Sequence, residues 1–180
     1  MITRLFTIVL AISVSIGCTS TYKAERPAGQ TAPHLEQGQC SIYVSVPQDG
    51  SYADRHGKGS GVTTAQSVVN AFLPYVTRAE RGEAPESNEV ALSHAAAGNF
   101  THYVEPTILN WEDRATEWSG KSDAISIRLV LVEVPSRKQI DTMIIHGKSK
   151  WASFGGDHPQ DLLAAPMARY SKELFGELAK

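Results

Sequence analysis

Residues Ala124–His146 read AISIRLVLVEVPSRKQIDTMIIH, in which two runs rich in β-branched residues flank a short polar break that contains a proline. This pattern predicts a β-hairpin. The first run places aliphatic residues at every second position, and therefore on one face of a strand: Ile125, Ile127, Leu129 and Leu131. Farther along this strand the opposite face also becomes apolar, as expected for a central strand whose sheet is covered by helices.

Strand and helix patterns alternate on both sides of the hairpin. The patterns predict strands at 40–46, 75–81 and 100–109, a helix capped by Thr63 and ended by Pro74, a helix at 87–97, and a final helix that restarts at Pro166. We therefore predict the α/β (α+β) class, with a single mixed sheet of about five strands. The expected order is β-α-β-α-β-β-β-α, with the helices mainly on one face.

The first 17 residues have the features of an export signal. Arg4 precedes Leu5–Ile16, an apolar run of twelve residues that is too short to cross a bilayer, which needs about 20 residues. A small residue and then Cys18 end this run, and the arrangement resembles the lipobox of bacterial lipoproteins, although Ser15 stands where leucine is usual. That resemblance implies that residues 1–17 are a lipoprotein signal peptide and that Cys18 is the lipidated first residue. It also implies sorting to the outer membrane, because Thr19 is not aspartate.

Two further regions follow. Residues 18–39 hold the lipidated cysteine and a polar stretch with prolines and glycines, which we interpret as a flexible tether. Residues 40–180 are expected to form a single globular α/β domain. Once Cys18 is acylated, Cys40 has no cysteine with which to form a disulfide, and we expect it to be a small buried hydrophobic residue.

Charge and motifs do not indicate catalysis. The formal net charge of −2 gives no electrostatic case for nucleic acid as a partner. The six histidines do not form a pair at helical metal-ligand spacing, so we predict no metal and no cofactor. Residues Gly57–Gly61 are rich in glycine but lack the spacing of a phosphate-binding loop. We therefore predict no catalytic residues and no enzyme activity.

The connector before the hairpin holds the candidate interaction residues Trp111, Arg114 and Trp118. In one interpretation the tryptophans cover the sheet edge and Arg114 pairs with a carboxylate. In the other the connector is a recognition loop, because tryptophan and arginine are common at interface hot spots. We expect Trp111 to be structural and Trp118 to be the more exposed residue.

Three stretches carry a family resemblance: PTILNWEDR at 106–114, EWSG at 117–120 and GGDHPQDLL at 155–163. They resemble an uncharacterised family of lipoproteins from Gram-negative bacteria, known as a domain of unknown function. The element order more distantly resembles the amino-terminal domain of TolB and the lipoprotein activators of penicillin-binding proteins, which are interaction modules. The resemblance implies no catalytic residues.

The expected function is thus a non-catalytic interaction module in the cell envelope, lipid-anchored through Cys18 to the periplasmic face of the outer membrane, with an envelope protein as its possible partner. The alternative is a small periplasmic hydrolase or ligand-binding protein that uses the acidic connector between Trp111 and Trp118, together with His102.

Overall fold

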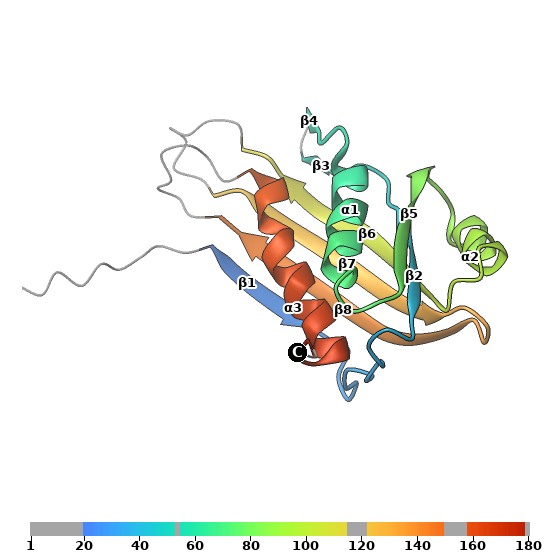
Figure 1. Cartoon of the computed structure of the whole chain (residues 1–180). Coiled ribbons are helices and arrows are strands. Elements are labelled where there is room, and N and C mark those ends of the chain that lie inside the picture. The colour runs from blue at the N-terminus through green and yellow to red at the C-terminus, as the bar shows by residue number, and fades with distance from the viewer. Residues whose placement is uncertain (1–19, 53–54, 115–121, 150–157, 179–180) are drawn as a thin grey trace, which may run out of the picture.

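The computed structural model describes residues 20–52, 55–114, 122–149 and 158–178. Within these ranges the fold is mixed α+β, with one open six-stranded sheet and three α-helices (Figure 1). The sheet strands are β1 (Thr21–Glu25), β2 (Ser41–Val46), β5 (Arg78–Pro85), β6 (His102–Glu112), β7 (Ala124–Glu133) and β8 (Lys138–Lys148). The remaining elements are the hairpin of β3 (Ser51–Tyr52) and β4 (Arg55–His56), α1 (Ser60–Phe72), α2 (Asn88–Ala97), the 3-10 helix η1 (Pro159–Leu162) and α3 (Ala164–Phe175).

The sheet has the strand order β1-β8-β7-β6-β2-β5. The neighbours β1/β8, β8/β7 and β7/β6 are antiparallel, whereas β6/β2 and β2/β5 are parallel, so the sheet is mixed as predicted. The predicted hairpin is confirmed as β7 and β8, and β7 is a central strand. Its four aliphatic residues at alternate positions, Ile125, Ile127, Leu129 and Leu131, have at most 1% of their surface exposed.

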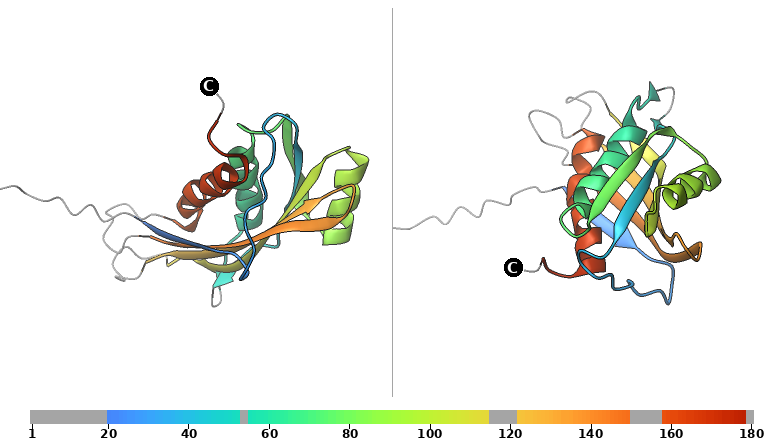
Figure 2. Two further views of the ribbon diagram at one scale, coloured as in Figure 1. Left: turned by 90° about the horizontal axis from the view of Figure 1, so that it is seen from below. Right: turned by 45° about the vertical axis from the view of Figure 1, so that its right-hand side comes forward.

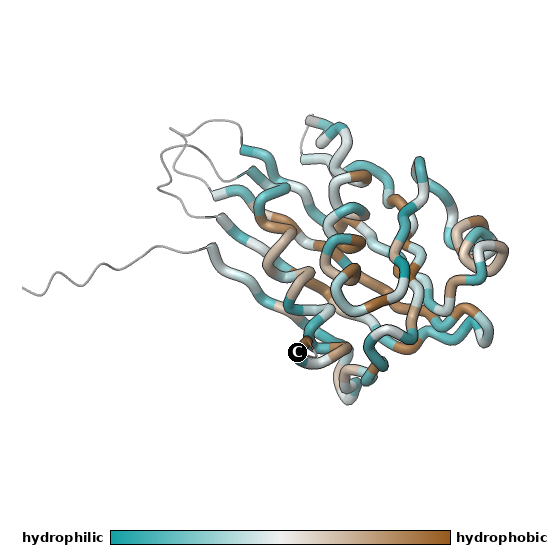
Figure 3. Tube along the Cα trace, viewed as in Figure 1, coloured by the Kyte–Doolittle hydropathy of each residue, from teal (hydrophilic) through white to brown (hydrophobic). Residues whose placement is uncertain are grey.

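The helices divide between the two faces of the sheet. On one face, α1 and α3 pack against the sheet (Figures 2 and 3). They cover the larger hydrophobic core, which includes Ile42 and Val44 of β2. On the other face, α2 covers a smaller cluster that includes Tyr43, the residue between them, together with Tyr103 and Val132. Most of the helical cover is thus on one face, as predicted, and α2 covers only one end of the opposite face. No helix among the described residues is long and apolar enough to cross a membrane.

The amino-terminal segment corrects the predicted organisation. The sequence indicates about five strands and a flexible tether over residues 18–39, but Thr21–Glu25 forms the sixth strand, β1, at the sheet edge beside β8. After β1 the chain passes the end of α3, where the N–H of Leu35 donates to the carbonyl of Leu174 at 2.9 Å. Most of β1 is exposed and polar, so it has no apolar alternation that would predict a strand.

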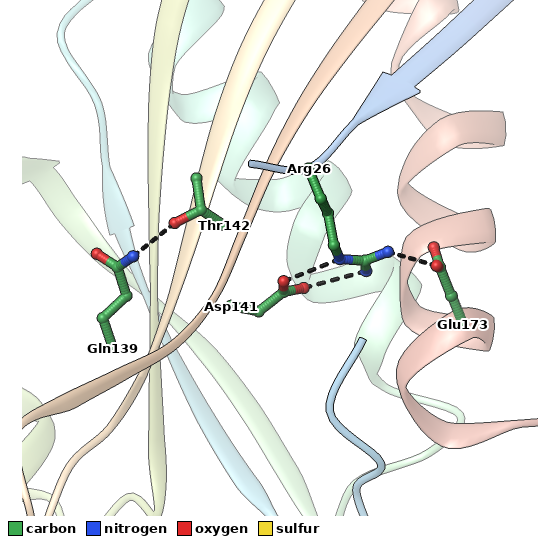
Figure 4. A network of polar contacts seen from close by, with 5 residues as sticks. All are labelled: Arg26, Gln139, Asp141, Thr142 and Glu173. Carbon is green, nitrogen blue, oxygen red and sulfur yellow. Dashed lines mark hydrogen bonds and ion pairs between the residues drawn. The ribbon is translucent and has the colours of Figure 1, made fainter. Parts of the chain in front are cut away.

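An ion-pair network fastens this segment to the domain (Figure 4). The Arg26 guanidinium donates to both oxygens of Asp141 in β8, at 2.9 and 3.1 Å, and also to Glu173 in α3. The Asp141 side chain is fully buried, whereas 44% of the Glu173 side chain is exposed. Burial by itself would lower the pKa of Arg26, but the hydrogen bonds to Asp141 and then to Glu173 raise it, which keeps this residue charged. Residues 20–39 are therefore joined to both layers of the fold.

Candidate functional site

The first candidate residue, Trp111, lies near the end of β6 and is 4% exposed. The loops around the β3–β4 hairpin pack closely on it. A Cβ atom on Gly50 would lie 2.5 Å from the Trp111 Cβ, and one on Gly57 would lie 2.7 Å from its Cδ1. Positions 50 and 57 thus require glycine, because a side chain at either position would clash with Trp111. Trp111 belongs to the larger core, as the structural interpretation expects.

The second candidate residue, Arg114, fastens the start of the connector. Its guanidinium donates to the Glu112 carboxylate, with Nε at 2.9 Å from Oε2, and its carbon lies 5.4 Å from the centre of the Tyr52 ring. Its backbone N–H donates to the Asp123 carboxylate at 2.7 Å. Burial raises the pKa of Asp123, and the N–H of Arg114 partly opposes that shift. Arg114 is therefore engaged within the chain, as the structural interpretation expects.

The other end of the connector is also held. The N–H of Asp123 donates to the Ser149 hydroxyl and the N–H of Ser149 donates to the Asp123 carbonyl, both at 2.9 Å. The ends of β6, β7 and β8 are thus tied together at one end of the sheet. The third candidate, Trp118, and the lipidation residue Cys18 lie outside the described residues.

The glycine-rich loop before α1 already holds an anionic group from its own chain. The Asp49 carboxylate accepts from the N–H groups of Gly59 and Gly61, at 2.9 and 2.8 Å. The Gly61 bond and then the Gly59 bond lower the pKa of Asp49. The helix begins at Ser60, so the predicted cap at Thr63 is wrong, and Asp49 occupies the position that a phosphate would take at a helix amino-terminus.

A polar hollow of about 300 Å³ brings together three motifs that are far apart in the sequence. Its lining includes Lys58 and Ser60 from the glycine-rich loop, Trp111 and Asp113 from the connector, and Gln160 from η1. No local signal in the sequence connects these motifs, because none shows that β6 ends beside the start of α1. We call this feature the loop-end hollow.

Those residues of the hydrolase alternative that the structure describes do not converge. His102 begins β6 and Glu112 ends it, so ten residue steps of extended chain, about 30 Å, separate them. His102 is 9% exposed, burial lowers its pKa, and its Nδ1 lies 2.9 Å from the Thr101 hydroxyl. Among the described residues, no group of three or more histidine, cysteine, aspartate or glutamate side chains could hold a metal ion.

Solved structures that match with TM-scores above 0.5 share this fold. The PelC dodecamer from Paraburkholderia phytofirmans matches with a TM-score of 0.65 and 12% identity, over 88% of this chain and 99% of that chain. Protein XCC0632 from Xanthomonas campestris, of family DUF330, matches with a TM-score of 0.53 and 10% identity, over 81% and 90% of the two chains. Lipoprotein GNA1162 from Neisseria meningitidis gives a TM-score of 0.47 and 10% identity, over 64% and 88%.

No curated protein matches the sequence. A family model does match it. The model is that of DUF4823, a domain of unknown function, and it covers residues 34–174, which includes every strand of the sheet except β1. Because this match extends over most of the chain, the protein belongs to the DUF4823 family.

Proposed function

We propose that this DUF4823 protein is a lipid-anchored component of the bacterial envelope that binds a partner and does not catalyse a reaction. The lipid is attached to Cys18, and the domain lies on the periplasmic face of the outer membrane. The apolar run that ends at Cys18 supports the anchor. The fold, which is shared with PelC and a DUF330 protein, is compatible with an envelope protein.

The observation that carries the binding role is the internal use of charged groups around the connector. Glu112 is paired with Arg114, Asp123 accepts from the Arg114 N–H, and Asp49 caps α1. A hydrolase needs a free acid or base within hydrogen-bond reach of its substrate. These carboxylates instead hold loops in place, so they favour a rigid surface for a partner.

A small-molecule site at the loop-end hollow is the second candidate. Its lining is mostly polar and includes Trp111 and Asp113. The volume of about 300 Å³ is at the lower end of the range for small-ligand pockets. A ligand would have to bind between the glycine-rich loop and η1, so Lys58→Ala should weaken it without loss of fold, as measured by calorimetric titration of candidate ligands.

The anchor is tested by mass spectrometry of the protein extracted from membranes. We expect an acylated amino-terminal peptide that begins at Cys18, and Cys18→Ala should leave an unacylated precursor. Cys40→Ala is the matched control, because this buried thiol lies in the domain and its loss should not affect acylation. An unmodified Cys18 in membrane-extracted wild-type protein would refute the anchor.

The binding role is tested by crosslinking in intact envelopes and purification of the adducts. Trp118→Ala should keep the fold and reduce one specific adduct, whereas Arg137→Ala, in the exposed turn between β7 and β8, should not change it. Arg114→Ala separates structure from recognition, since its pair with Glu112 is partly exposed and such surface pairs contribute little to stability. Full adduct yield from both Trp118→Ala and Arg114→Ala would rule out recognition by the connector.

A further inference from the structure

The start of β1 limits how far the domain can move from its anchor. Cys18 and Thr21 are three residues apart, and a fully extended chain spans at most about 3.6 Å per residue. Thr21 therefore lies within about 11 Å of Cys18, whatever the conformation of the residues between them. The polar headgroup layer of a bilayer is itself about 5–8 Å thick on each side. A lipid on Cys18 would hold the first sheet strand at the membrane surface.

Strand register shows which part of the domain lies beside Thr21, the residue of the sheet that is nearest to Cys18 in the sequence. Thr21 is paired with Lys148 at the end of β8, and Lys148 is paired with Ala124 at the start of β7. Ala124 is in turn paired with Glu112 at the end of β6. Four strands thus start or end together, at the end opposite the β7–β8 turn (Figure 1). We call this the anchor end of the sheet.

The outer face of the sheet, opposite α1 and α3, has a hollow of about 310 Å³ at the anchor end. Small side chains from β7, Ala124 and Ser126, form its floor. Lys23, His146 and Lys148 surround them, and the Ser126 hydroxyl lies 2.8 Å from Nδ1 of His146. Since α2 covers only the far end of this face, no helix among the described residues covers the hollow.

The charges around this hollow are mainly basic. The Lys23 ammonium is paired with Glu25, whereas the exposed Lys148 makes no ion pair with any described residue. At the same end of the sheet, the Glu112 carboxylate is already paired with Arg114. An ammonium that has no ion-pair partner in the described part of the chain, and that lies beside a concave polar floor, is suited to the phosphate group of a phospholipid.

We infer that the outer face at the anchor end docks on the phospholipid headgroups of the membrane that holds Cys18, with Lys148 as the principal phosphate contact. This inference rests on the proposed lipid anchor. It goes further by giving the domain one orientation, with β1, β7 and β8 near the membrane and α2 away from it. One lysine near an anionic surface favours the docked state by about fivefold.

The orientation is measured on acylated protein in vesicles of phosphatidylcholine, with and without phosphatidylglycerol. A fluorophore is attached to Asn110→Cys on the outer face, Ala168→Cys on the exposed side of α3, or Ser136→Cys at the far turn. Cys18 is acylated and Cys40 is buried, so neither competes for the label. Lipids with a quenching nitroxide headgroup should quench the Asn110 label most strongly, and more so when phosphatidylglycerol is present.

Charge reversal tests the contact itself. Lys148→Glu should lower the ratio of docked to undocked protein in phosphatidylglycerol vesicles by about fivefold or more. Lys138→Glu, an exposed lysine at the opposite end of the same strand, is the matched control and should have no effect. Stronger quenching at Ala168 or Ser136 than at Asn110, equal quenching at all three, or the same result for Lys148→Glu and Lys138→Glu would overturn the docking. An unmodified Cys18 in the same sample would instead refute the anchor on which it depends.

Discussion

Replacing Arg26 with alanine should destabilise the domain far more than is usual for a residue in a polar terminal segment. Arg26→Ala would leave the Asp141 carboxylate, which is fully buried, without the two hydrogen bonds that now compensate its charge. Removing one partner of a buried ion pair costs about 3–5 kcal/mol, because the remaining charge has neither its partner nor water. Urea denaturation followed by tryptophan fluorescence measures this loss.

Two further variants show whether burial is the cause. Glu173→Gln removes the negative charge of the exposed acceptor for the same guanidinium, and it should lower the free energy of unfolding by less than about 1 kcal/mol, as for other surface pairs. In an Asp141→Asn background, Arg26→Ala should cost less than it does in the wild type, because the uncompensated charge is gone. If Arg26→Ala lowers the free energy of unfolding no more than Glu173→Gln does, burial of Asp141 is not the cause, and Arg26 is a surface residue on a loose segment.

Three other changes test the rest of the fold by the same denaturation assay. Leu129→Ala, at a side chain with no exposed surface, should cost about 2–5 kcal/mol, and a loss below about 0.5 kcal/mol would show that the faces of β7 are misassigned. Trp111→Ala should cost about 3–5 kcal/mol because it empties the space beneath the β3–β4 loops, and an unchanged midpoint would contradict this packing. Asp49→Ala should lower the free energy of unfolding by about 0.5–2 kcal/mol, because it removes the carboxylate that caps α1. Since the pKa of Asp49 is lowered in the fold, its stabilisation is present above the unfolded pKa and is lost as the pH falls through the folded pKa, a dependence that the alanine variant should lack.

Periodic burial is what made the sheet predictable. The alternating residues of β7 face a continuous core, so the sequence pattern and the tertiary structure agree there. Pro74 follows the end of α1 at Phe72, and the Ser87 hydroxyl accepts the N–H of Val90 at the start of α2, as local capping signals indicate.

Long-range contacts are what the sequence could not reveal. Strand β1 is held by backbone pairing and by Arg26, whose partner Asp141 is 115 residues away. The cap of α1 is Asp49, which lies ten or more residues before the glycines whose N–H groups donate to it. The local pattern at Thr63 therefore indicated the wrong start for the helix. The loop-end hollow likewise forms only when the ends of β6 and η1 meet the glycine-rich loop.

The segment after Cys18 is part of the folded sheet, so the lipid that we propose on Cys18 would hold the anchor end close to the membrane. Amide hydrogen exchange over Thr21–Glu25, followed by mass spectrometry, tests this most directly. If β1 is paired with β8 throughout, these amides should be protected, with the opening free energy of a structured edge strand. Exchange at the rate of an unstructured peptide would contradict the account, because the segment would then be the flexible tether that its composition suggests.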